Sequence, residues 1–341
     1  MARSVPQTIR ATGLVMGVVA VQALFLTLFA WPAVNTEPRD LPIVVAGPAP
    51  VADAMKQQLE KFRPGAFQID TVADAEAADD AIRHREAYGA FVVTSPNGPT
   101  VATHVSSAAS PVVAQLLIQI GQTAGPDSGQ TQPHPVVDVV PADKDDPRGA
   151  GLAAGVLPLI MTSIVVGMLL TFVIGGRIAR FVGVILYAAL AGLAATWILQ
   201  YGLHAISGDY LQNAQVVALI ALAMAGAIAG LGALLGVAGA VIGAVVVFLL
   251  GNPLSGITSA PEMLPQPWGE VGQWLPPGAG GTLLRSVVFF DGAGGTLPMW
   301  ILAGWSALAL LTLVGRAGGP RTAAEPAESA VADQPEPAAA A

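Results

Sequence analysis

Five stretches without a charged residue constrain this chain more than any other feature. They lie between Arg10 and Glu37, Arg148 and Arg177, Arg180 and Asp209, Asp209 and Glu262, and Asp291 and Arg316. Apolar runs of about 18 or more residues are typical of transmembrane helices. Charged residues make up 11% of the chain, whereas a soluble domain carries about 25%. The sequence therefore predicts an integral membrane protein of the α-helical class.

The apolar runs predict six transmembrane helices. Four of the runs fit one span each, at about 11–31, 152–174, 181–203 and 298–315. The run 216–250 would form roughly 52 Å of helix at 1.5 Å per residue, against a hydrocarbon core of about 30 Å. Two spans joined by a tight turn near Gly232–Gly236 use this length and complete the six.

Arginine positions predict that both termini lie in the cytoplasm of a multi-pass cell-membrane protein. With the N-terminus inside, the short inner segments hold Arg3, Arg10, Arg177, Arg180, Arg316 and Arg321. The outer connections 204–214 and 252–297 hold one basic residue, Arg285. This asymmetry follows the positive-inside rule, and five spans would fit it less well.

The first apolar run has two interpretations, an anchor or a cleaved secretory signal. Two arginines precede it, as in signal peptides. A cut after Ala33 would put bulky Trp31 at the −3 position. We therefore expect residues 1–33 to form a cytoplasmic N-terminus and an uncleaved first span.

Residues 34–150 predict a small extracytoplasmic α/β domain inserted between the first and second spans. Short β-branched or aromatic runs alternate with segments of helical periodicity, which is typical of an α/β domain. The expected strands are Leu41–Ala46, Phe67–Val72, Gly89–Thr94, Thr100–Ser106 and Val136–Val140. The expected helices are Ala52–Phe62, Asp74–Arg85 and one from Pro111 to about Gln122.

No residue pattern predicts catalysis, so we expect a protein that is not an enzyme and binds no cofactor or metal. His84, His104 and His134 lack metal-ligand spacing, and the chain has no cysteine. The acidic stretch Asp74–Asp80 is typical of a solvated helix face, with a calcium site as the alternative. The net charge of −8 argues against a nucleic-acid partner.

The membrane half, residues 151–317, is predicted to be a five-helix bundle rich in small residues. Glycines four positions apart allow helix backbones to approach closely in lipid. They predict either packing within the chain or the seam of a homodimer. These glycines are Gly226 with Gly230, Gly232 with Gly236, and Gly239 with Gly243.

The segment Asp146-Pro147-Arg148-Gly149 precedes the second span. Pro147 disfavours helix at Asp146, and Gly149 permits a sharp bend. Arg148 can reach lipid headgroups or pair with Asp145 or Asp146. The pattern predicts a hinge where the chain re-enters the membrane, with a direct role in gating or ligand contact as the alternative.

The outer segment 252–297 is rich in glycine, proline and tryptophan. Tryptophan near the end of a span suits the membrane–water interface. We expect Pro276-Pro277-Gly278 to start a short helix over Thr282–Phe290, lying on or dipping into the outer leaflet. The segment is predicted to be a structural cap over the bundle or an outer gate containing Trp268, Trp274, Pro276, Pro277, Arg285 and Phe289.

The tail 318–341 is composed largely of alanine, proline and glutamate. Such a composition buries too little apolar surface to fold. We therefore expect a disordered cytoplasmic tail.

Three stretches carry a resemblance to a known family. They are Val72–Thr94 (VADAEAADDAIRHREAYGAFVVT), Val137–Gly151 (VDVVPADKDDPRGAG) and Asn252–Asp291, with NPLSG and MLPQPWGEVGQWLPPGAGGTLLRSVVFFDG. Their order resembles the membrane subunit of type-2 ABC exporters, in the group that includes the phage-infection proteins (Pip-like permeases). The resemblance implies a permease that works as a dimer with a separate ATPase subunit.

Two functions are therefore expected. The first is a permease subunit that exports a hydrophobic or amphipathic substrate and contacts membrane lipid. The second is a non-transporting membrane scaffold or secretion-accessory protein whose outer domain binds a partner. The short, uncharged inner connection at Gly232–Gly236 favours the second, because it offers little surface to an ATPase.

Overall fold

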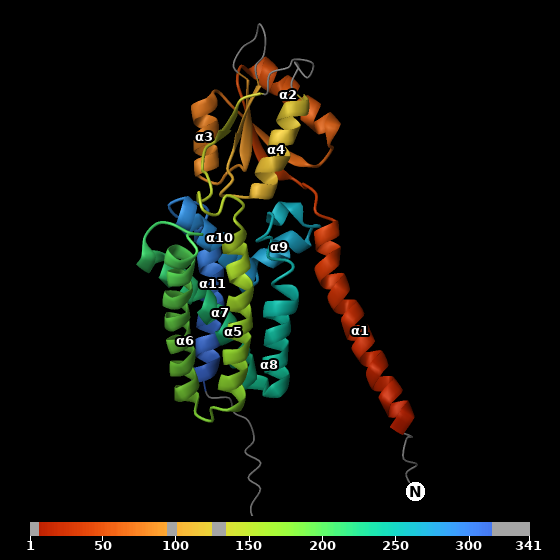
Figure 1. The fold of residues 1–341 in the computed structure, drawn as a ribbon, viewed down its shortest axis with the longest axis vertical. Helices are drawn as coiled ribbons and strands as arrows, with labels where there is room; N and C mark the ends of the chain where they lie inside the picture. The colour runs from red at the N-terminus through yellow and green to blue at the C-terminus, as the bar shows by residue number, and fades with distance from the viewer. Residues whose placement is uncertain (1–6, 94–100, 125–133, 316–341) are drawn as a thin grey trace, which may run out of the picture.

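The computed structural model describes residues 7–93, 101–124 and 134–315. An α/β domain, running from β1 to β5, is stacked on one end of a helical bundle, and α1 extends beside the bundle (Figure 1). The predicted tail 318–341 lies outside the described residues, as do Arg3, Arg316 and Arg321.

The α/β domain is built on one five-stranded sheet with the order β2-β1-β3-β4-β5. Strand β1 is parallel to both β2 and β3, β4 is antiparallel to β3, and β5 is parallel to β4. The strands are β1 (Leu41–Ala46), β2 (Phe67–Val72), β3 (Gly89–Val93), β4 (Val101–Val105) and β5 (Val136–Asp138). All five predicted strands are present, each ending within two residues of its predicted limits among the described residues.

Helices cover both faces of this sheet, which explains why β1 is apolar along its whole length. Ile43 and Val45 pack with α2 (Ala49–Phe62) and α4 (Pro111–Ala124). The alternate residues Val44 and Ala46 pack with α3 (Ala75–Arg83) on the other face. The Asp74 side chain accepts a hydrogen bond from the Ala77 N–H and caps α3, as expected for an aspartate at a helix start.

Five helices among the described residues are long and apolar enough to cross a membrane. They are α1 (Gln7–Val34), α5 (Ala150–Phe172), α6 (Arg177–Trp197, continued by a π-helical turn to Gly202), α7 (Tyr210–Leu235) and α11 (Thr296–Val314). Helix α7 is the most enclosed of them and packs against α5, α6 and α11. The chain is thus a multi-pass helical membrane protein with an α/β domain.

The run 216–250 forms a helical hairpin, as predicted, although its arms are unequal. Helix α7 ends at Leu235, and Gly236 turns the chain with a left-handed φ of 63°. The second arm is α8 (Val237–Ala244), continued as a π-helix to Leu250. Its 14 residues span about 21 Å, less than a hydrocarbon core of about 30 Å. The described part of the chain therefore contains five long apolar helices that could span a membrane and this shorter one.

The segment 252–297 folds into three short helices that close the end of the bundle next to the α/β domain (Figure 1). They are the 3₁₀ turn η3 (Pro261–Met263), α9 (Trp268–Gln273) and α10 (Pro276–Phe289). Most of α10 is buried against α7, α11 and α5. We expected this helix to lie on or dip into the outer leaflet, but it packs against the bundle instead. Small residues such as Gly280 let α10 approach Ile220 of α7.

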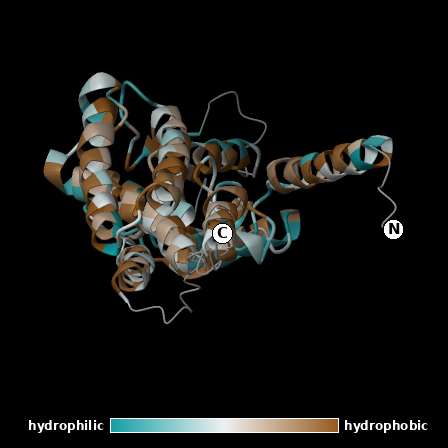
Figure 2. Ribbon diagram, turned by 90° about the horizontal axis from the view of Figure 1, so that it is seen from below, coloured by the Kyte–Doolittle hydropathy of each residue, from teal (hydrophilic) through white to brown (hydrophobic). Residues whose placement is uncertain are grey.

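Helix α1 stands apart from the bundle over most of its length (Figure 1). Viewed from below the bundle, it extends to one side, and its residues are largely apolar (Figure 2). Its side chains are mostly exposed, and one of its contacts is the ring of Phe29 against Phe248, with centroids 5.5 Å apart. An isolated apolar helix of this length fits a lipid surrounding.

Candidate functional site: a cavity between the α/β domain and the bundle

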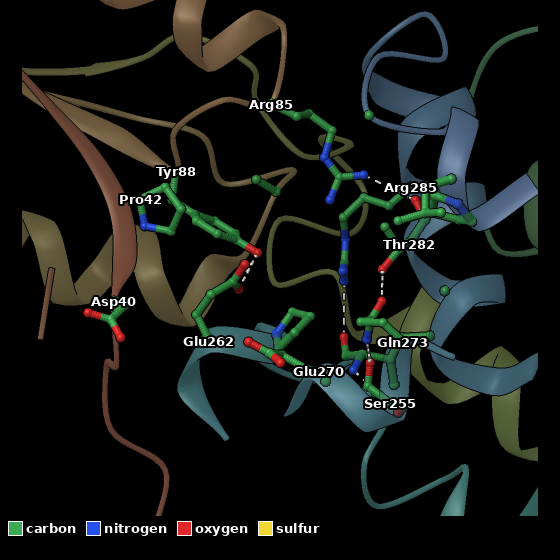
Figure 3. Close-up of a pocket in the computed structure, with 18 of the residues that line it drawn as sticks. Asp40, Pro42, Arg85, Tyr88, Ser255, Glu262, Glu270, Gln273, Thr282 and Arg285 are labelled. Carbon is green, nitrogen blue, oxygen red and sulfur yellow. Dashed lines mark hydrogen bonds between the residues drawn. The ribbon is translucent and has the colours of Figure 1, made fainter. Parts of the chain in front are cut away.

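A cavity of about 590 Å³ lies between the α/β domain and segment 252–297. We call it the junction cavity. Side chains from both parts point toward the same hollow (Figure 3). The polar residues lining it include Arg39, Asp40, Arg85, Glu86, Tyr88, Glu262, Glu270, Gln273, Thr282 and Arg285.

Hydrogen bonds across the junction hold the two parts together. The Tyr88 hydroxyl donates to the Glu262 carboxylate at 2.9 Å. Arg85 donates from Nη1 to the Ser286 hydroxyl at 2.5 Å and to the Thr282 carbonyl at 3.1 Å. These contacts join residues more than 170 positions apart in the sequence, so they fix where the α/β domain sits on the bundle.

The turn between α3 and β3 brings Arg85 and Tyr88 to this junction. Arg85 has a left-handed φ of 60°, which reverses the chain after α3. The Tyr88 N–H then donates to the Pro42 carbonyl at 3.0 Å, immediately before β3. The guanidinium of Arg85 also lies 5.2 Å from the centre of the Phe290 ring, a cation–π contact.

Arg285 is the most deeply buried charged residue of the junction cavity. Its exposed fraction is 7%, and its Nη2 donates to the Ile257 carbonyl at 3.0 Å. Among the described residues, no carboxylate lies within 4.0 Å of the guanidinium of Arg285 or of Arg85. The wall of the cavity thus carries one buried cation, Arg285, and one half-buried cation, Arg85, and neither has an ion-pair partner among the described residues.

Burial changes the proton affinity of these groups. It lowers the pKa of Arg85, an effect that nearby Tyr88 and Glu262 oppose. Burial also raises the pKa of Tyr88 strongly, and the negative charge and hydrogen bond of Glu262 add to this effect. Arg285 lies outside the candidate spans. Burial and the nearby charge of Arg85 lower its pKa to about 10. Both arginines are cations at neutral pH, because arginine keeps its proton in proteins.

The residues predicted to form an outer gate are divided by the structure. Arg285 and Trp274 line the junction cavity, whereas Trp268 is exposed on α9 outside it. Pro276 and Pro277 form the buried first turn of α10. Phe289, at the end of α10, packs against the bundle core. Of this set, only Arg285 and Trp274 are in a position to touch a ligand in the junction cavity.

The predicted hinge forms a helix cap. Both carboxylate oxygens of Asp146 accept hydrogen bonds at the start of α5, from the N–H groups of Ala150 at 2.8 Å and Gly151 at 2.7 Å. Gly149 has a left-handed φ of 60°, and Pro147 lies in the turn before it. Among the described residues, no carboxylate is within ion-pair distance of Arg148. Of the two contacts considered for Arg148, the pair with Asp145 or Asp146 is therefore not formed. The Asp146 carboxylate caps the start of α5 instead.

Five of the six glycines in the predicted pairs lie against other parts of the same chain. A Cβ at Gly226 would come within 2.9 Å of Ala309 on α11, and one at Gly230 would meet the same helix. Gly232 faces Thr171 of α5. Gly239 and Gly243 face α7 across the hairpin. Gly236 has open space around its Cα and forms the turn between α7 and α8. The glycines of the predicted pairs therefore serve packing and a turn within this chain.

Sequence reasoning did not single out Arg85, Tyr88 or Glu262. Each is an ordinary polar residue in its own segment, and its role appears only when distant segments meet. Arg285 had a local signal, because it is the one cation in segment 252–297. Likewise, His104 pairs with Asp79, with Nδ1 2.6 Å from the carboxylate, although no spacing in the sequence linked them.

The junction cavity is suited to binding. It combines guanidinium donors, hydroxyl and amide groups with apolar residues of α11 such as Leu297 and Ile301. In the described part of the chain, no group of three or more His, Cys, Asp or Glu side chains is arranged to hold a metal ion. Comparisons of the chain with known protein families, with curated proteins and with solved structures found no match.

Proposed function

We propose that this chain is the membrane subunit of an export system for a hydrophobic or amphipathic molecule. In this proposal the protein has six spans, with α8 and its π-helical extension as the shortest. The α/β domain lies outside the cytoplasm, and both termini lie inside. The resemblance to type-2 ABC permeases supports the proposal, as do the long apolar helices, whose charged residues are confined to their ends.

The orientation is supported by charge and by aromatic residues at opposite ends of the bundle. Arg177 and Arg180 lie at the end away from the α/β domain (Figure 1). Arg177 donates to the Gly315 carbonyl, and Arg180 donates to the carbonyls of Thr171 and Ile174. Cations that bind the last carbonyls of a helix also favour its dipole. Exposed Trp268 and Trp274 lie at the other end, as expected at a membrane–water interface.

The junction cavity is the observation that carries the transport proposal. It lies where an exported molecule would leave the bundle, between the ends of the spans and the α/β domain. Its lining combines polar groups with apolar side chains of α11, a candidate span. Such a lining suits an amphipathic substrate, whose polar end needs hydrogen bonds and whose apolar end needs a dry wall.

A separate ATPase subunit and a homodimer are further parts of this proposal. The connection between α5 and α6 comprises residues 173–176, and Gly236 alone joins α7 to α8. Such short connections give an ATPase a small contact surface. They favour the second candidate, a membrane scaffold or secretion-accessory protein whose α/β domain binds a partner.

Site-specific crosslinking separates the two candidates. A photo-crosslinking residue replaces Gly175, which has open space around it, and the matched control replaces exposed Lys61 on the α/β domain. The export proposal expects an ATP-hydrolysing subunit to be captured from Gly175 and not from Lys61, and identified by mass spectrometry. Capture of a partner from Lys61, with no ATPase from Gly175, would support the scaffold function and contradict the export proposal.

A further inference from the structure

Arg285 of the junction cavity is unusual because burying a cation normally requires a partner of opposite charge. An unpaired charge loses its hydration on burial, and buried arginines are therefore paired in most proteins. Arg285 is 7% exposed, yet one carbonyl, that of Ile257, accepts its described hydrogen bond. A guanidinium has five N–H donors, so most of its donor capacity remains to be used.

Arg85, which comes from the α/β domain, adds a second cation to this site. Its guanidinium is held by the Thr282 carbonyl, the Ser286 hydroxyl and the Phe290 ring, which orient it without neutralising it. The Arg85 guanidinium lies near enough to Arg285 that its charge lowers the pKa of Arg285. Figure 3 shows both side chains entering the hollow, Arg85 from the α/β domain and Arg285 from α10.

The acidic residues of the junction cavity offset these cations only in part. Glu262 already accepts the Tyr88 hydroxyl and lies beyond ion-pair distance of both arginines. Asp40, Glu86 and Glu270 also line the cavity, and all three are exposed residues. Water screens charges at an exposed rim more strongly than charges on a buried wall. The inner part of the cavity is therefore positive, because the two guanidinium groups of Arg85 and Arg285 stand against the single carboxylate of Glu262.

We infer that Arg85 and Arg285 form a binding site for the phosphate group of a ligand. Arginine recognises phosphate through its planar fork of donors, often with two parallel hydrogen bonds. A volume of about 590 Å³ exceeds the needs of one phosphate ion and accommodates the head group of an amphiphile. Leu297, Pro298 and Ile301 of α11 line the same cavity and offer an apolar wall to the adjoining part of the ligand.

The phosphate site does not depend on transport. Only the identification of its ligand with the exported molecule rests on the proposed function. A binding measurement on the purified full-length chain in detergent, without any ATPase, therefore tests the site alone. Failure of the export proposal would leave the expected binding unchanged, whereas failure of binding would leave the ATPase crosslinking result unchanged.

Three probes distinguish the sources of phosphate: phosphatidic acid, inorganic phosphate and uncharged diacylglycerol, each added to delipidated protein and followed by native mass spectrometry. The inference expects phosphatidic acid to bind and diacylglycerol not to bind. Binding of inorganic phosphate with equal dependence on Arg285 would identify the free ion as sufficient. No binding of inorganic phosphate would identify the lipid head group. Equal binding of phosphatidic acid and diacylglycerol would overturn the inference.

Substitutions test the residues themselves. Arg285→Gln and Arg85→Gln should each weaken phosphatidic acid binding by about tenfold or more, since each removes charge-assisted hydrogen bonds. Arg285→Lys should restore part of the affinity. The matched control is Arg83→Gln on α3, a surface arginine that pairs with Asp80 and does not line the cavity. It should bind as the wild type does.

Glu262→Gln provides a second test that does not depend on the folding of the arginine variants. Glutamine can still accept the Tyr88 hydroxyl, while the negative charge facing the site is removed. Phosphatidic acid should therefore bind more tightly to this variant, an effect that misfolding would not produce. Unchanged or weaker binding to Glu262→Gln, or wild-type binding to folded Arg285→Gln, would overturn the assignment.

Discussion

The Tyr88 hydroxyl donates a 2.9 Å hydrogen bond to the Glu262 carboxylate, and the two residues are 174 positions apart in the sequence. Tyr88 belongs to the α/β domain, and Glu262 belongs to the segment that closes the bundle. The bond therefore connects the two parts of the molecule beside the junction cavity. Its removal should loosen the position of one part on the other.

Tyr88→Phe tests this connection directly. Loss of a hydrogen bond to a charged group costs about 1.5–3 kcal/mol, so the variant should unfold at a lower temperature in detergent. Hydrogen exchange should increase at η3 and at the start of β3, and not in α6. In a double-mutant cycle, Tyr88→Phe and Glu262→Ala, each of which removes the hydrogen bond, should be non-additive. Additive effects would show that the bond contributes little.

The raised pKa of Tyr88 predicts a loss of stability in alkali. An ordinary tyrosine loses its proton near pH 10, whereas burial and Glu262 hold the proton on Tyr88 to higher pH. The unfolded chain releases this proton first, so the contribution is fully present below about pH 10 and falls above it, by about 1.4 kcal/mol per pH unit. Unfolding measured from about pH 8 to about pH 11 should show a steeper decline for the wild type than for Tyr88→Phe. Parallel curves would contradict the prediction.

Asp146→Ala should destabilise the start of α5. Its carboxylate accepts hydrogen bonds from two N–H groups of the first turn, and loss of such a cap costs about 0.5–2 kcal/mol. Arg148→Ala is the matched control, because no carboxylate pairs with Arg148 among the described residues. Thermal unfolding should separate the two variants. Equal destabilisation would show that Arg148 has a structural role of its own.

Gly230→Leu should disturb the packing of α7 on α11. A Cβ at this position would already meet Thr312, and it would lie 3.2 Å from the Ala309 Cα. Excess volume in a packed interface costs about 1–3 kcal/mol or more. The control is Gly304→Leu on α11, where a Cβ has no neighbour within 4 Å. Lower yield and thermal stability are expected only for Gly230→Leu, with an unchanged oligomer profile for the folded fraction. A selective loss of dimer would instead assign Gly230 to a seam between subunits.

Local pattern was sufficient for the elements of the α/β domain. Leu41–Ala46 and Phe67–Val72 have the predicted limits, because alternation and β-branched residues act within a few positions of the chain. The turn at Gly236 was also predictable, since a helix formed by the whole apolar run 216–250 would be longer than the hydrocarbon core is thick. Asp146 was expected at a hinge, and its capping role follows from the position that its carboxylate takes at the start of α5.

The junction cavity could not be predicted in the same way. Arg85 meets Ser286 across 201 positions, and no periodicity connects such residues. Helix α10 was expected at the lipid surface because its sequence is apolar on one face, but glycines on its other positions allow it to pack inside the bundle. Which surfaces an apolar helix contacts is decided by the packing of all its neighbours, which the local sequence does not contain.

Membrane topology underlies the whole account, and the absence of cysteine permits a direct measurement. Single cysteines replace Lys61, Gly175, Glu270 and Ala341 in turn, and intact cells are treated with a membrane-impermeant maleimide. The six-span arrangement predicts labelling at Lys61 and Glu270 from outside, and at Gly175 and Ala341 only after permeabilisation. Labelling of Gly175 from outside with Lys61 protected would reverse the orientation. Protection of Glu270 with labelling of Ala341 would show that α8 does not cross the membrane, and would contradict the six-span arrangement.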